Sequence, residues 1–79
     1  MGKYYRESSY RNFSRFFKKE GFYVRNDGPH LVAIHSENPD LRFAVPRNTK
    51  ISNGVTEQLC KKLIELGYDE KVITKYILK

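Results

Sequence analysis

The fold of this chain is decided by the stretch Arg25–His35, which reads RNDGPHLVAIH. Its first half is a turn signal. Asn26-Asp27-Gly28 is typical of a tight β-hairpin turn, and Pro29 has no N–H to give to a sheet, so it is expected at a strand start or on an edge. The second half is an apolar run typical of a strand. Nothing in the backbone requires a histidine here, so His30 is the first candidate for a functional role.

Two further strands are predicted on either side of this one. Phe22–Arg25 alternates with period two, as a half-buried strand does. The strand after the turn is expected to run over His30–Ser36, and its apolar residues fall on both faces. That pattern predicts a central strand covered on both sides. A second turn at Glu37–Asp40 leads to a third strand, Leu41–Val45, which Pro46 closes.

Apolar residues recur with helical periodicity both before and after the three strands. Ser9 is predicted to cap a helix that begins at Tyr10 and ends at Gly21. One face of this helix is aromatic and is interpreted as core: Tyr10, Phe13, Phe16 and Phe17.

Two helices are predicted after the strands. Ser52 or Asn53 is expected to cap the first of them, and Gly67 is expected to end it. Its apolar stripe is predicted to comprise Val55, Leu59, Leu63 and Leu66, with Cys60 and Ile64 beside it. Asp69 is expected to cap a short last helix.

This order of elements predicts an α+β fold. One antiparallel three-stranded sheet with helices on one face makes a two-layer αβββα domain, the order found in double-stranded-RNA-binding domains, here with an extra C-terminal helix. We expect a single domain over residues 1–79. Residues 1–8 are interpreted as a basic arm and residues 68–79 as a C-terminal helical extension.

The charge balance favours a polyanionic partner. The 79 residues contain 15 Lys and Arg against 9 Asp and Glu, a formal net charge of +6 at pH 7. Nucleic acid is the first expectation and an acidic protein the second, while surface solubility is the simplest alternative.

Several classes of protein are not expected. The only cysteine, Cys60, excludes an internal disulfide framework and is interpreted as a helix packing residue. No apolar run has the length of a transmembrane helix, and the first residues do not resemble a signal peptide, so a cytoplasmic location without membrane association is the default expectation. The two histidines and the scattered carboxylates do not form a metal-ligand pattern, and no cofactor is expected.

The order of small motifs along the chain resembles the HicA (YcfA-like) family of bacterial toxins. The resemblance covers about Tyr10 to Leu66. It is carried by Gly21-Phe22, by the Gly-x-His turn Gly28-Pro29-His30, by Val45-Pro46 at the end of a strand, and by a helix that opens Ser-Asn-Gly-Val-Thr. Members of that family are small ribonucleases with a double-stranded-RNA-binding-like fold, neutralised by HicB antitoxins.

The resemblance implies a metal-independent endoribonuclease that cleaves messenger RNA. The catalytic histidine of the family corresponds to His30, which has the right kind of side chain for proton transfer near neutral pH. His35 lies about 16 Å further along an extended strand, too far to share the site. Expected partners are RNA and a HicB-like antitoxin. The residues expected to bind RNA are Lys18, Lys19, Arg25, Gly28, Arg47 and Lys50.

Two other functions remain open on the sequence. Pro29 stands where the family usually has serine, and Arg47 or Asn48 stands where it often has a second histidine, which favours a non-catalytic RNA- or protein-binding domain on the same fold. The other alternative is a small interaction protein of phage or mobile-element origin, which uses the αβββα body and its C-terminal helix to dimerise or to bind an acidic host protein. Exposed apolar residues on that last helix would support it.

Overall fold

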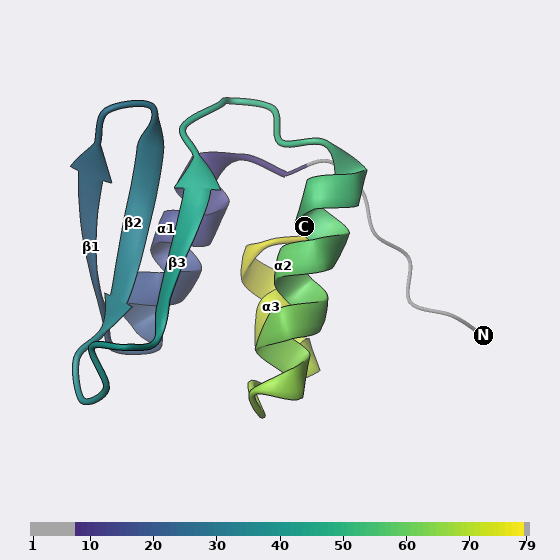
Figure 1. Cartoon of the computed structure of the whole chain (residues 1–79). Coiled ribbons are helices and arrows are strands. Elements are labelled where there is room, and N and C mark those ends of the chain that lie inside the picture. The colour runs from purple at the N-terminus through teal and green to yellow at the C-terminus, as the bar shows by residue number, and fades with distance from the viewer. Residues whose placement is uncertain (1–7, 79) are drawn as a thin grey trace.

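The computed structural model describes residues 8–78 and shows the α+β architecture predicted from the sequence. In chain order the elements are α1 (Tyr10–Lys19), β1 (Phe22–Asp27), β2 (His30–His35), β3 (Arg42–Pro46), α2 (Asn53–Glu65) and α3 (Glu70–Tyr76). The three strands form one antiparallel sheet in the order β1-β2-β3. Helix α1 lies across one face of the sheet, and α2 and α3 stand beside it (Figure 1).

Helix α1 begins and ends as its sequence predicts. The Ser9 side chain accepts a hydrogen bond from the Asn12 N–H at 3.4 Å, which satisfies one of the unpaired first-turn donors. Gly21, just after the helix, has a φ of 87°, a left-handed conformation that glycine adopts without strain. The buried face is Phe13, Phe16 and Phe17, and Tyr10 is only half-buried.

The first hairpin turns two residues later than the Asn26-Asp27-Gly28 signal predicted. Asp27 pairs with His30, so Asn26 and Asp27 belong to β1, and the loop is Gly28-Pro29. Gly28 has a φ of 61°, whereas the proline ring fixes a negative φ at Pro29. A two-residue hairpin loop with positive φ only at its first position is a type II′ turn, so Pro29 lies in the turn and not in a strand.

The sheet is covered on one face only, which corrects the expectation for β2. The inward side chains are buried against the helices: Phe22, Leu31, Ala33, Phe43 and Val45. The register places Val32 opposite Arg25 and Ala44 on the other face, where Val32 and Ile34 are half-buried rather than covered. The apolar residues of β2 on both faces therefore do not mean that both faces are packed.

Helix α2 is capped by Ser52, whose side chain accepts from the Val55 N–H at 3.3 Å. Its buried face differs from the predicted leucine stripe. Thr56, Cys60 and Leu63 are fully buried, whereas Leu66 is 45% exposed. The helical period identified the correct side of α2, but the stripe is rotated toward Thr56, whose hydroxyl hydrogen-bonds the Ile51 carbonyl at 3.5 Å.

Helix α3 is part of the core rather than an appendage. Ile73, Ile77 and Leu78 are buried in the same cluster as the α1 phenylalanines, and α1 packs against α3. The Ser8 hydroxyl donates a hydrogen bond to the Ile77 carbonyl at 2.8 Å, and Ser8 also pairs with Ile51 through its backbone. The buried apolar face of α3 does not favour a dimerisation helix. The rest of the predicted basic arm, residues 1–7, lies outside the described residues.

Candidate functional site

His30 is the first residue of β2 and is exposed to solvent. It pairs with Asp27 on one side and with Pro46 on the other, so it lies at the end of the central strand, where the sheet meets the Gly28-Pro29 turn. Alternation along β2 points its side chain to the face that carries no helices, because Leu31 is buried on the opposite face. A polar substrate can reach this side chain without any movement of the fold.

Arg47 is fixed beside this turn by two hydrogen bonds. Its backbone N–H donates to the Pro29 carbonyl at 2.9 Å, and its guanidinium Nη1 donates to the Gly28 carbonyl at 3.0 Å. The two bonds tie the residue after β3 to the residues just before His30. The structure thus brings together three of the residues predicted for the site: Gly28, His30 and Arg47.

Tyr10 joins this end of the molecule, although the sequence was interpreted as placing it in the core. The Arg47 guanidinium carbon lies 6.0 Å from the centre of the Tyr10 ring, and the Tyr10 N–H donates to the Asn48 carbonyl at 3.1 Å. A hydrogen bond and the positive charge of Arg11 lower the pKa of Tyr10, and the charge of Arg47 adds to this effect. The phenol oxygen therefore lies beside two positive charges, those of Arg11 and Arg47.

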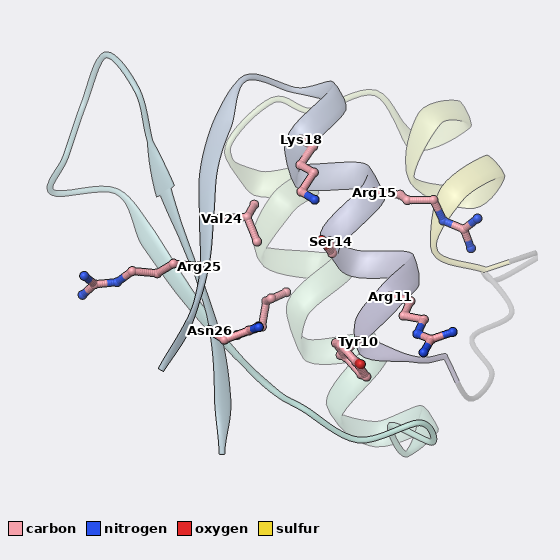
Figure 2. Close-up of a pocket in the computed structure, with 9 residues that line it drawn as sticks. Tyr10, Arg11, Ser14, Arg15, Lys18, Val24, Arg25 and Asn26 are labelled. Carbon is pink, nitrogen blue, oxygen red and sulfur yellow. The ribbon is translucent and has the colours of Figure 1, made fainter. Parts of the chain in front are cut away.

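A basic groove runs between α1 and β1 from this tyrosine toward the other end of the helix (Figure 2). Its volume is about 510 Å³, and none of its lining residues is acidic. The lining residues are Tyr10, Arg11, Ser14, Arg15, Lys18, Val24, Arg25, Asn26 and Leu31. A groove lined by cations and by hydrogen-bonding groups fits a phosphate backbone.

The structure separates the other predicted RNA-binding residues from His30. Lys18 lies eight residues along α1 from Tyr10, which is about 12 Å along the helix axis. Lys19 is exposed at the C-terminal end of the same helix, and Lys50 is exposed in the loop before α2. Arg25 borders the groove, but its side chain points to the opposite side of β1 from Val24 (Figure 2). These four cations are therefore spread over α1, β1 and the loop before α2, and they do not gather around His30.

His35 differs from the solvent-facing residue that was expected. Its ring stands edge-on to Phe22 with centroids 5.1 Å apart, and its Nδ1 accepts the Glu37 N–H at 3.1 Å. It is half-buried at the far end of β2 from His30 and has a local structural role. Cys60 is buried in α2, as its interpretation as a packing residue requires.

Within residues 8–78, no cluster of three or more His, Cys, Asp or Glu side chains has the geometry to hold a metal ion. None of the helices in this part of the chain is both long and apolar enough to cross a membrane.

No family model, curated protein or solved structure that was compared with this chain matches it. The functional interpretation therefore rests on the residues and their geometry.

Proposed function

We propose that this protein is a metal-independent endoribonuclease of the HicA type, in which His30 carries the proton-transfer chemistry. The observation that carries the proposal is the placement of an exposed histidine directly after a turn that Arg47 holds by two hydrogen bonds. The resemblance in sequence to the HicA family points to the same histidine. The proposed substrate is messenger RNA.

The chemistry uses the 2′-hydroxyl of the RNA as nucleophile. The 2′-oxygen forms a bond to phosphorus while the bond from phosphorus to the 5′-oxygen breaks, leaving a 2′,3′-cyclic phosphate and a 5′-hydroxyl. One proton leaves the 2′-hydroxyl and one reaches the 5′-oxygen, and an imidazole serves in either transfer. His30 makes one of these two transfers and solvent water makes the other, while Arg47 stabilises the charge that develops on the phosphoryl oxygens.

The proposal includes a protein partner. A toxin of this type is neutralised by an antitoxin, and a HicB-like protein with an acidic surface would complement the cations around the groove and cover His30. A protein that binds there competes with RNA for the same side chains. Inhibition of cleavage should therefore weaken as salt screens the charges.

One observation favours a second function, a non-catalytic RNA-binding domain. Within residues 8–78, His30 has no hydrogen bond to a group that orients its ring, whereas catalytic imidazoles are generally oriented by a second residue. Binding by the groove does not depend on this orientation. The two functions differ in turnover and not in affinity.

The test compares cleavage of one labelled RNA by the wild type and by His30→Ala, each with and without EDTA. We expect cleavage by the wild type, with a cyclic-phosphate end, and a loss of about 100-fold or more in the variant. His35→Ala is the matched control, because it removes the other histidine from the same strand, and its thermal unfolding midpoint is measured alongside.

Each outcome decides between the functions. Equal cleavage by the wild type and His30→Ala would exclude the role of His30. RNA binding without cleavage by either protein would favour the non-catalytic domain. Cleavage that disappears with EDTA would exclude the metal-independent mechanism.

A further inference from the structure

The face of the sheet that carries no helices has a composition unlike the packed face. The register places nine outward residues on it, which we call the open face: Tyr23, Arg25, Asp27, His30, Val32, Ile34, Arg42, Ala44 and Pro46. Tyr23 is 62% exposed, although all five phenylalanines of the chain are buried. An exposed aromatic ring among cations on the surface of a sheet is suited to the stacking of bases and to the binding of phosphates.

These residues form rows across the sheet. Tyr23, Ile34 and Arg42 are aligned in one row, and Arg25, Val32 and Ala44 are aligned in the next. The third row contains His30 between Asp27 and Pro46. Asp27 is the only acidic side chain in the three rows, against two arginines, so this face attracts a polyanion.

We propose that the open face binds single-stranded RNA, with a base stacked on Tyr23 and the backbone running along the strands toward His30. This inference rests on the proposed function in one respect, the choice of RNA, and it adds the site that presents the substrate. In this inference, the basic groove between α1 and β1 does not hold the RNA strand that reaches His30.

The spacing of the rows fits one strand of nucleic acid. His30 and Ile34 are four residues apart on β2, which is about 13 Å along the strand. About four nucleotides cover this distance at the stacked rise of about 3.4 Å per nucleotide. A base held on Tyr23 therefore sets which phosphodiester lies at His30. Tyr23 is a positioning residue in this arrangement.

Single-stranded RNA fits this face better than an RNA duplex does. Duplex RNA hides its bases and is recognised by shape over about 16 base pairs, whereas unpaired bases stack on exposed aromatic rings. The rows are short, and their central apolar residues, Val32 and Ile34, are only half-buried. The ring of a base fits this apolar surface, and the phosphates of the strand reach Arg25 and Arg42. One guanidinium nitrogen of Arg42 donates to the Pro39 carbonyl at 3.2 Å, and the remaining N–H groups of its fork are the ones that would meet a phosphate.

Fluorescence anisotropy with a labelled 2′-O-methyl oligoribonucleotide of about 12 nucleotides tests the proposal, because this probe binds but cannot be cleaved. We expect Tyr23→Ala to weaken binding about tenfold or more, the effect of one lost stacked base. Tyr23→Phe keeps the ring and should bind within about twofold of the wild type. Leu66→Ala is the matched control, since among residues 8–78 Leu66 is the other large apolar residue that is exposed, and it caps the C-terminal end of α2.

A second variant tests the phosphate contact. Arg42→Gln should weaken binding and reduce the slope of log affinity against log salt by about 0.7, the value for one phosphate of a single strand. The same oligonucleotide annealed to its complement serves as the duplex probe. Its affinity should be unchanged by Tyr23→Ala.

The failures of the two proposals are distinguishable. Tyr23→Ala that binds the single strand as tightly as the wild type does, with an unchanged unfolding midpoint, overturns the open-face site even if the protein cleaves RNA. Equal weakening of duplex and single strand overturns it as well. Binding that depends on Tyr23 in a protein that never cleaves supports the site and overturns the proposed ribonuclease.

Discussion

The two faces of the same three strands teach different things about this molecule. The inner face carries Phe22, Ala33 and Phe43, which are buried against the helices. The outer face carries Tyr23 and His30, which the fold does not need for packing. Because alternate residues of one strand experience such different constraints, the identity of an inner residue is explained by volume and that of an outer residue by chemistry.

The largest expected effect is the loss of free energy of unfolding when an aromatic side chain is removed from the packed side of the sheet. Phe17 is fully buried; it stacks on Phe13 and Phe43 and stands edge-on to Phe22. Phe17→Ala should lower the free energy of unfolding by about 3–5 kcal/mol, enough to unfold much of a 79-residue domain. Urea unfolding followed by circular dichroism measures this loss.

Tyr23→Ala on the outer face is the matched aromatic deletion. It should change the free energy of unfolding by less than about 1 kcal/mol, because the ring is mostly in solvent already. A loss at Tyr23 comparable to that at Phe17 would contradict the division into a packed face and an open face.

The sequence predicted the elements better than it predicted the site. Caps at Ser9 and Ser52 and the phenylalanine spacing of α1 are local signals, so the helices and the strand order followed from them. The hairpin was shifted, because Gly28 fits two competing turns and only the pairing of Asp27 with His30 decides between them. Pairing is a property of two strands, and one stretch of sequence does not contain it.

Tyr10 shows why the site itself was incomplete. An aromatic residue at helical spacing indicates the core, and Tyr10 does lie on the phenylalanine side of α1. Its contact with Arg47 joins residues 37 positions apart, and no local pattern contains such a contact. A tyrosine in a stripe of phenylalanines, followed directly by Arg11, was the signal available: a phenol differs from a phenyl ring by the one group that hydrogen-bonds.

The next largest effect is expected at Ser8, which holds the C-terminal end of α3 by a hydrogen bond. Ser8→Ala removes the hydrogen bond to the Ile77 carbonyl and one contact to the Asn12 side chain, and it leaves a buried carbonyl without that donor. We expect a loss of about 1–3 kcal/mol in the free energy of unfolding. Ser36→Ala, at an exposed position, should change it by less than about 0.5 kcal/mol. Equal effects at the two serines would mean that α3 is not fixed through Ser8.

A smaller effect is expected at the Gly28-Pro29 turn, which joins β1 and β2 just before His30. Gly28 has a φ of 61°, and a Cβ there would meet no atom within 4 Å, so Gly28→Ala costs backbone strain alone, about 1–2 kcal/mol. Gly54 lies in α2 with equal free space and no positive φ, so Gly54→Ala should instead stabilise the protein by up to about 1 kcal/mol. Thermal unfolding midpoints should therefore move in opposite directions, and a shift of the same sign would contradict the type II′ turn.

The smallest expected effect is a difference in pKa between two tyrosines. Tyr10 lies at the end of the molecule near Arg47, and Tyr68 packs against the core. The pKa of Tyr10 is lowered from its ordinary value of 10.0 by Arg11 and Arg47, whereas the pKa of Tyr68 is raised by burial and then by the charge of Glu20. Difference titrations of tyrosinate absorbance should place the component lost in Tyr10→Phe below pH 10.0 and the one lost in Tyr68→Phe above it.

The two shifts have opposite consequences for stability. Between its folded pKa and 10.0, Tyr10 binds a proton more often in the unfolded chain, so its contribution to stability grows with pH, is complete above 10.0 and is lost as pH falls through the folded value. The contribution of Tyr68 is complete below 10.0 and is lost as pH rises through its folded pKa. A Tyr10 component centred at or above 10.0 would mean that Arg11 and Arg47 do not create a positive field at the end of the molecule where His30 lies, and the electrostatic part of the proposed phosphate site would fall with it.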